Sequence, residues 1–271
     1  MAETTSAAPG AVGSGAAGAG ILARDGGASI AYRRLAGHNP GVVFIHGYRS
    51  DMEGGKALAL EQWCRDHGRA FLRFDMFGHG LSSGAIEDGT VGRWADDAEA
   101  AIAQLTEGPQ IVVGSSLGGW IALLAALRLR PRIAGLVGIA AAPDFTEDLM
   151  WAGFTPEQKR QLVEDGRVIQ ENCYDPSRPW VIPRRLIEDG RNHLLLRDTI
   201  NLYCPVRLIQ GQKDNDVPWR TALRISDCLA SEDVEVTLVK DGDHRLSRDH
   251  DLARLVRVVA TLAGQLSAPA A

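Results

Sequence analysis

Short apolar runs recur along the chain and alternate with segments in which apolar residues repeat at helical spacing. A continuous apolar run of four to eight residues that ends at Gly or a polar residue is typical of a buried strand. Runs of this kind lie at 41–46, 70–75, 110–114, 133–140, 206–210 and 234–239. Helical patterns lie near 55–67, 91–106, 118–129, 218–230 and 249–264. Alternating strands and helices predict a mostly parallel sheet with helices on both faces.

The alternation breaks at about residues 143–200. This stretch is polar, contains several Pro residues and shows mainly helical spacing of its apolar positions. Because it follows the fourth predicted strand, it leaves the sheet at the carboxyl edge of the strands. We therefore predict a mainly helical insertion that caps this edge, where open α/β sheets bind their ligands.

Residues 1–20 differ in composition from the rest of the chain. They are mostly Ala, Gly, Ser and Thr, and such a segment cannot bury enough surface to offset the entropy of ordering. We predict a disordered tail at 1–20 and a single domain at 21–271. The first basic residue is Arg24, so the tail lacks the basic residues of a secretory signal or transit peptide. A cytoplasmic location is expected; the alternative is a transit sequence of biased composition.

The overall composition narrows the class of protein. A chain of 271 residues with 45% hydrophobic residues is typical of a globular protein with a full core. The formal net charge of −5 argues against a nucleic-acid partner, which needs a basic face. No apolar run reaches the roughly 18 residues of a membrane span. The four cysteines are scattered, which suits a reducing cytosol and gives no metal-binding or redox spacing. We expect neither a metal nor another cofactor.

A serine flanked by glycines follows the third predicted strand. The segment Gly114-Ser115-Ser116-Leu117-Gly118 matches the pattern G-x-S-x-G, and a helical pattern begins directly after it. A strand, a tight turn and a helix in this order form a nucleophile elbow, whose turn leaves no room for side chains two residues from the serine. Ser116 has Gly at both of these positions, whereas Ser115 has Val113 and Leu117. We therefore predict that Ser116 is a nucleophile; the alternative is a glycine-rich turn with an incidental serine.

Two loops after later strands carry a carboxylate and an imidazole. Asp214 follows the strand at 206–210, and His244 follows the strand at 234–239. Both loops lie at the same sheet edge as Ser116, and the order Ser, Asp, His is the one expected for this type of elbow. A serine hydroxyl needs an imidazole base that a carboxylate orients. The sequence therefore predicts a triad of Ser116, His244 and Asp214.

Other acidic residues and histidines are weaker candidates, because we expect them to shape a turn, to support a helix start, to brace a loop, or to lie at the surface or in side-chain packing. These residues are His46, His79, Asp216, Asp241, Asp243, His193 and His250.

Two backbone N–H groups are candidates for an oxyanion hole. The first belongs to Leu117, the residue after the nucleophile. The second belongs to Tyr48, which follows Gly47 in the loop after the first predicted strand. Glycine at position 47 lets the backbone approach a substrate closely, and His46 is expected to brace the loop rather than to act as a base.

The motifs together resemble those of the α/β-hydrolase superfamily. They are His46-Gly47, Asp75-x-x-Gly78-His79-Gly80-x-Ser82, the Ser116 elbow, Gly211-x-x-Asp214-x-x-Val217-Pro218 and Asp243-His244. Within this superfamily, the chain resembles the abhydrolase-domain-containing protein ten type and its bacterial relatives. The similar segments are 47–52, 142–149, 187–193 and 214–219. This resemblance implies an α/β-hydrolase fold and hydrolysis of acyl thioesters such as S-palmitoyl cysteine, or of acyl glucuronide esters. It also implies that Ser116, Asp214 and His244 are the catalytic residues.

We predict a cofactor-free serine hydrolase that cleaves acyl thioesters or carboxylic esters. A palmitoyl-type thioesterase is the favoured interpretation. The alternatives are a general carboxylesterase or lipase, and a catalytically silent binding protein on the same fold. The partner is a small acyl substrate, and the sequence does not determine the oligomeric state.

Three aromatic residues of the insertion have two interpretations. Trp151, Phe154 and Trp180 either anchor the insertion to the body of the domain or line a tunnel for the acyl chain.

Overall fold

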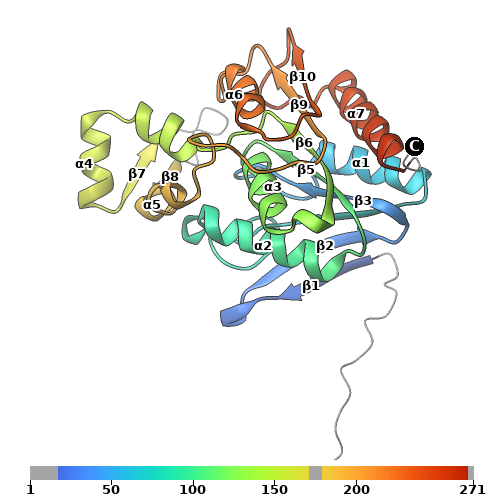
Figure 1. Cartoon of the computed structure of the whole chain (residues 1–271). Coiled ribbons are helices and arrows are strands. Elements are labelled where there is room, and N and C mark those ends of the chain that lie inside the picture. Colours follow the sequence, from blue (N-terminus) through green and yellow to red (C-terminus); the bar gives the residue numbers. More distant parts are fainter. Residues whose placement is uncertain (1–17, 171–178, 268–271) are drawn as a thin grey trace, which may run out of the picture.

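A central sheet of eight strands organises the chain in the computed structural model, which describes residues 18–170 and 179–267 (Figure 1). The strand order is β1-β2-β4-β3-β5-β6-β9-β10, and all neighbours from β4 to β10 run parallel, while β1 and β2 are antiparallel to their neighbours. The strands are β1 (Gly18–Ala23), β2 (Ser29–Leu35), β3 (His38–Ile45), β4 (Arg69–Phe74), β5 (Gln110–Ser115), β6 (Ile133–Ile139), β9 (Val206–Gly211) and β10 (Val234–Val239). The predicted, mostly parallel sheet with helices on both faces is confirmed.

Helices cover both faces of the sheet and divide the core in two. Alternate residues of β3 show the division, because Val43 and Ile45 pack with one cluster while Val42 and Phe44 pack with the other. The first cluster includes residues of α2, α3 and α6, and the second includes residues of α1 and α7. Burial on both faces explains why these strands are continuous apolar runs. The helices of the body are α1 (Gly55–Asp66), α2 (Val91–Leu105), α3 (Leu117–Arg128), α6 (Arg220–Cys228) and α7 (Asp249–Ser267), with 3-10 turns at Asp25–Gly27, Ile86–Asp88 and Arg130–Arg132.

The insertion between β6 and β9 forms a separate group of elements beside the sheet (Figure 1). It is mainly helical, but it also contains a two-stranded antiparallel hairpin that the helical spacing did not predict. Its elements are the π-helix η4 (Thr146–Trp151), α4 (Pro156–Glu164), β7 (Arg167–Gln170), β8 (Trp180–Pro183), α5 (Arg184–Gly190) and the 3-10 helix η5 (Arg191–His193).

A buried carboxylate fastens the two ends of this insertion to each other. Asp144 is fully buried and has a φ of 62°, and its carboxylate accepts hydrogen bonds from the N–H groups of Leu195 (2.7 Å) and Leu196 (2.8 Å). Arg197 Nη1 lies 3.2 Å from the same carboxylate. These contacts join the chain as it leaves β6 to the chain as it returns, so the insertion is anchored at its base.

The amino-terminal boundary differs from the prediction. Strand β1 begins at Gly18, so residues 18–20 belong to the sheet and not to a tail; residues 1–17 lie outside the described residues. Strands β1 and β2 gave no sequence signal of a buried strand, because β1 lies at the edge of the sheet and only Ile30 and Ala31 of β2 are fully buried. Within the described ranges, no helix is long and apolar enough to cross a membrane.

The close approach of α3 to β3 can be tested by adding one methyl group. A Cβ at Gly118 would contact the backbone carbonyls of Ile45 and His46, which cannot move independently of the sheet. We expect Gly118→Ala to lower the free energy of unfolding by at least about 1–3 kcal/mol, measured by urea denaturation.

The matched control is Gly264→Ala in α7, where a Cβ would meet nothing within 4 Å. Because Ala favours a helix interior over Gly, this variant should be neutral or more stable by up to about 1 kcal/mol. Equal stability of the two variants would contradict the described packing of α3 on β3.

Candidate active site

The turn at Ser116 joins β5 to α3 in a strained conformation. Ser116 has φ 55° and ψ −120°, values that a residue with a side chain rarely adopts. Three backbone hydrogen bonds hold it there: Ser116 N–H donates to Ile139 O (2.9 Å), and Ser116 O accepts from the N–H groups of Gly119 (2.8 Å) and Ala142 (3.1 Å). The end of β6 and the segment after it therefore fix the turn, and the serine side chain projects at the sheet edge.

The flanking glycines are required by contact with the backbone. A Cβ at Gly114 would contact the carbonyl group of Gly118, and a Cβ at Gly118 would contact the carbonyl group of Ile45. The spacing of the sequence motif therefore reflects the tight turn. Ser115 lies inside β5, where it is buried and pairs with Ile139.

The structure brings the three residues of the predicted triad together in one hydrogen-bonded chain. His244 Nε2 lies 3.1 Å from Ser116 Oγ, and His244 Nδ1 lies 2.8 Å from Asp214 Oδ2. A carboxylate only accepts hydrogen bonds, so Nδ1 carries the proton of the neutral imidazole and Nε2 accepts from the serine hydroxyl. The loops after β5, β9 and β10 supply the three side chains, as the carboxyl edge of a parallel sheet predicts.

Asp214 is held in place by four hydrogen-bond donors. Its Oδ2 accepts from His244 and from Gln210 Nε2 (2.8 Å), and its Oδ1 accepts from the N–H groups of Asp216 (2.9 Å) and Val217 (2.8 Å). Gln210, on β9, was not predicted as a site residue. Its position at the end of a predicted strand, four residues before Asp214, could have indicated that it lies near the carboxylate. The carboxylate therefore has a fixed orientation toward the imidazole.

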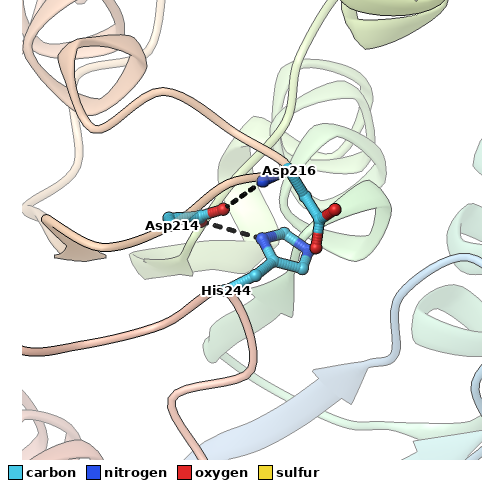
Figure 2. Close-up of side chains that lie close together, drawn as sticks. All are labelled: Asp214, Asp216 and His244. Carbon is cyan, nitrogen blue, oxygen red and sulfur yellow. Dashed lines mark hydrogen bonds and ion pairs between the residues drawn. The ribbon is translucent and has the colours of Figure 1, made fainter. Parts of the chain in front are cut away.

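Asp214, Asp216 and His244 also form the one group of ligand-type side chains within the described ranges that could surround a metal ion, with their ligand atoms within 4.8 Å of one another (Figure 2). The four donors on Asp214 occupy its acceptor positions. The arrangement therefore fits a hydrogen-bonded acid and base better than a set of metal ligands.

Two buried histidines support the loop that carries Tyr48. His46 Nδ1 donates to Gly47 O (2.8 Å), and His79 Nε2 accepts from Arg49 N–H (3.2 Å), so both peptide groups next to Tyr48 are held. Arg49 has a φ of 57°, which this contact helps to maintain. A Cβ at Gly47 would lie 3.3 Å from Ser116 Cβ, so the loop passes close to the nucleophile. Leu117 is the first residue of α3, and its N–H is among those that have no acceptor within the helix.

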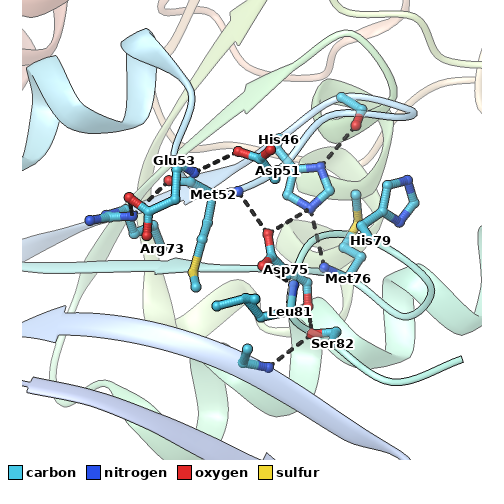
Figure 3. Close-up of polar contacts among 12 residues, drawn as sticks. His46, Asp51, Met52, Glu53, Arg73, Asp75, Met76, His79, Leu81 and Ser82 are labelled. Atoms are coloured by element: carbon cyan, nitrogen blue, oxygen red, sulfur yellow. Dashed lines mark hydrogen bonds and ion pairs between the residues drawn. The ribbon is translucent and has the colours of Figure 1, made fainter.

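A second layer of polar contacts lies under this loop (Figure 3). Asp75 accepts hydrogen bonds from the N–H groups of Met52 (2.7 Å) and Leu81 (2.8 Å), and His46 Nε2 accepts from Met76 N–H (3.2 Å). Burial raises the pKa of the Asp75 carboxyl and lowers the pKa of both His46 and His79 to about 4. The two histidines are therefore neutral at physiological pH and serve as fixed donors and acceptors, in agreement with the structural roles predicted for them.

A cavity of about 850 Å³ opens over Ser116 and His244. Trp180 lines it, as one of the two interpretations predicted. Trp151 and Phe154 are not among the residues that line it. They pack against each other with ring centroids 6.4 Å apart, and Arg191 and Lys159 lie over Trp151. The sequence did not identify several apolar residues of the lining, among them Ala142, Phe145, Leu149 and Met150. Leu149 and Met150 lie in the π-helix η4 and Phe145 is its N-cap, so α-helical spacing did not predict which of these side chains face the cavity.

Comparison with known proteins places this geometry among enzymes. A family model described as alpha/beta hydrolase fold matches residues 40–179. The palmitoyl-protein thioesterase ABHD10, mitochondrial, of Rattus norvegicus is 39% identical over 239 residues, which cover 88% of this chain and 80% of the rat protein. The structure of alpha/beta hydrolase domain-containing protein 10 from mouse matches with a TM-score of 0.86 and 38% identity, covering 92% of this chain and 100% of the mouse chain. A putative hydrolase from Agrobacterium vitis S4 matches with the same TM-score and identity, over 91% of this chain and 98% of that chain.

The predicted cytoplasmic location is wrong on this comparison, because the rat relative is named as a mitochondrial protein. The prediction rested on the absence of basic residues before Arg24 and on scattered cysteines. Neither property reports a compartment, since a reducing environment is not confined to the cytosol.

The low pKa values of the two buried histidines predict how the free energy of unfolding changes at acid pH. Because the folded pKa of His79 is about 4 and the unfolded value is near 6.5, the unfolded state binds a proton first as the pH falls. Stability should therefore decrease between pH 7 and pH 4, with His79 contributing about 3 kcal/mol of that loss. The measurement is the free energy of unfolding from urea titrations at several pH values.

His79→Gln is the comparison, because an amide keeps a donor and an acceptor but does not titrate in this range. It should be less stable at pH 7 and should lose less stability on acidification. Buried carboxyls with raised pKa values oppose the trend, and Asp97 does so in both proteins alike, because His79 is not among the groups that shift its pKa. Parallel pH profiles for the two proteins would refute the assignment.

Proposed function

Because the chain belongs to the α/β-hydrolase family, we propose that it hydrolyses acyl thioesters of the palmitoyl type with Ser116, His244 and Asp214 as its catalytic residues. The observation that carries this proposal is the continuous chain of hydrogen bonds from Asp214 through His244 to Ser116. The name of the rat relative, a palmitoyl-protein thioesterase, supports the substrate class.

The first half of the reaction forms an acyl-enzyme. Ser116 Oγ attacks the acyl carbonyl while His244 Nε2 accepts the hydroxyl proton, and Asp214 stabilises the imidazolium that results. The N–H groups of Tyr48 and Leu117 donate to the oxyanion of the tetrahedral intermediate, and a donor of this kind contributes about 3–4 kcal/mol. The imidazolium then gives its proton to the departing sulfur, which leaves as a thiol.

The second half of the reaction releases the acyl group. His244 removes a proton from a water molecule, which attacks the acyl-enzyme through a second oxyanion. Collapse of this intermediate returns the proton to Ser116 Oγ and releases the fatty acid. The triad and the two N–H donors thus act twice, and each step balances without a further reactant.

The apolar part of the cavity lining suits an acyl chain. Phe145, Leu149 and Met150 come from the insertion, and Trp180 lies at the start of β8. We assign these residues to the acyl pocket and regard the insertion as its cap. Trp151 and Phe154 are assigned to anchoring the cap, in place of the tunnel role that the sequence left open.

Carboxylic esters are the alternative substrate class, since the same residues cleave oxygen esters. A panel of thioesters and oxygen esters with the same acyl group and matched leaving groups tests the proposal through kcat/KM. A thioester preference is expected; a preference for the oxygen ester in every matched pair would favour a general carboxylesterase.

Substitution of the two adjacent serines separates the nucleophile from its neighbour. Ser116→Ala should lower kcat by about a thousandfold or more and abolish labelling by a fluorophosphonate probe. Ser115→Ala should retain labelling and change kcat only a few-fold, because Ser115 is the last residue of β5 and His244 Nε2 contacts the hydroxyl of Ser116 instead. Labelling of the Ser116→Ala protein, folded as judged by circular dichroism, would exclude the assignment.

Two tryptophans of the cap provide a matched test of the acyl pocket. Trp180 lines the cavity and Trp151 does not. In the parent protein, kcat/KM should rise with acyl-chain length, since each buried methylene contributes about 0.8 kcal/mol at most. Trp180→Ala should flatten this rise and spare short substrates. Trp151→Ala should lower the melting temperature and reduce kcat/KM for all chain lengths alike. The same uniform loss in Trp180→Ala would argue against the pocket.

A further inference from the structure

A second hollow, of about 540 Å³, lies beside the catalytic cavity and takes no part in the mechanism described above. The base of the cap lines it between residues 143 and 152, and the chain that returns from the cap lines it at Leu196 and Arg197. The start of α6 and the residue Pro218 complete the lining. The second hollow is therefore enclosed by the cap and by the loop that follows the catalytic carboxylate.

A thin wall separates the second hollow from the catalytic cavity. Ala142 lines the catalytic cavity, whereas the next residue, Pro143, lines the second hollow. Val217 and Pro218 are divided in the same way. Among residues 18–170 and 179–267, Leu149 alone lines both spaces. The side chain of Leu149 is therefore the point at which the two spaces come closest.

The π-helix η4 and the two residues after it form most of this wall. Met150 and Gly153 line the catalytic cavity, and Asp148 and Ala152 line the second hollow. Leu149, between them, is half-buried and packs against the larger core cluster. One helical turn thus presents a different side to each space, and at Leu149 the wall is a single side chain.

The second hollow suits the end of an alkyl chain better than it suits an anion. Its charged side chains already contact other groups of the protein. Asp148 pairs with Arg197 and with Arg224 (2.8 Å), and the Arg220 guanidinium lies 4.4 Å from the ring centroid of Trp219. The rest of the lining is largely apolar and consists of Pro143, Leu149, Ala152, Leu196 and Pro218. Apolar surface of this kind stabilises buried methylene groups.

We propose that Leu149 sets the longest acyl chain that the enzyme accepts, by closing the catalytic cavity against the second hollow. The acyl chain, attached to Ser116 in the acyl-enzyme, follows the apolar part of the cavity and ends at Leu149. The proposal rests on the proposed acyl hydrolysis and adds the residue that determines chain-length specificity. Leu149 takes no part in the bond-breaking steps.

The competing explanation is that Leu149 is one wall residue among several, so that any truncation beside it enlarges the cavity equally. Met150→Ala is the matched control, because Met150 is the next residue of η4 and lines the catalytic cavity without lining the second hollow. Ala152→Trp tests the other side of the wall. Ala152 is exposed and lines the second hollow alone, so a large side chain there fills that space from outside.

The experiment measures kcat/KM for thioesters of one thiol with straight acyl chains from butanoyl to octadecanoyl, all below their micelle concentrations. Each value is divided by the hexanoyl value of the same protein, so that a general loss of activity cancels. A second series measures the rate at which alkyl fluorophosphonates of the same lengths inactivate each protein. This series reports how the chain fits without requiring deacylation.

In the parent protein, both series should rise with chain length and then level off. Leu149→Ala should extend the rise by at least two carbons, with a gain of about tenfold for the longest chains over the parent. Met150→Ala should keep the levelling point of the parent. Adding Ala152→Trp to Leu149→Ala should restore that point, because the chain can no longer enter the second hollow. Ala152→Trp by itself should follow the parent.

Leu149→Phe provides a test that does not depend on the fold of Leu149→Ala. It keeps the wall and extends it into the catalytic cavity, so the levelling point should move to shorter chains. Melting temperatures of all variants show which proteins are folded.

Three results would overturn the proposal. They are an unchanged levelling point in both folded Leu149 variants, an equal extension in Met150→Ala, and a shorter limit in Ala152→Trp by itself, which would show that the chain already passes Leu149. Failure of the proposed hydrolysis is a different result, since the parent protein would then turn over no thioester. The fluorophosphonate series would still report the chain-length limit as long as Ser116 is labelled.

Discussion

The strained turn at Ser116 is the constraint on which the rest of this structure depends. Its backbone hydrogen bonds reach Ile139 and Ala142, so the nucleophile is tied to the end of β6 as well as to its own strand. The turn also brings α3 so close to β3 that only glycine fits at position 118. Strain of this kind persists only where the surroundings over-determine it, and here the sheet, the helix and the following segment all contribute.

Hydrogen bonds fix the polar groups around the turn, and each polar atom acts either as a donor or as an acceptor. Asp214 receives four donors, which leaves His244 with a defined tautomer and an acceptor directed at Ser116. On the opposite side, burial keeps His46 and His79 neutral, so they can hold the loop of Tyr48 without adding charge near a developing oxyanion. Preorganised donors of this type need little rearrangement during a reaction.

The distribution of charge in the cavity connects the fold to the choice of substrate. The cap contributes apolar side chains, and the start of α1 contributes Lys56 beside Arg245. The same sheet edge thus supplies the reactive groups, an apolar wall and a polar, charged region from separate loops. This arrangement allows the substrate to be selected by loops and cap while the sheet keeps the reactive geometry constant.

Local constraints explain what the sequence determined by itself. Burial on both faces produces the continuous apolar runs of β3 to β6, and the turn at Ser116 demands glycines at fixed spacing, so the parallel sheet and the order Ser116, Asp214, His244 were predictable. Tertiary structure alone decided which cap residues face the cavity, because Trp151 and Trp180 have the same chemistry and differ only in what packs around them. Tertiary structure also decided that Lys56 Nζ donates to the backbone carbonyl of Arg245, next to His244, although the two residues lie 189 positions apart in the sequence. Long-range packing brings such residues together, and the spacing of residues along the chain does not predict these contacts.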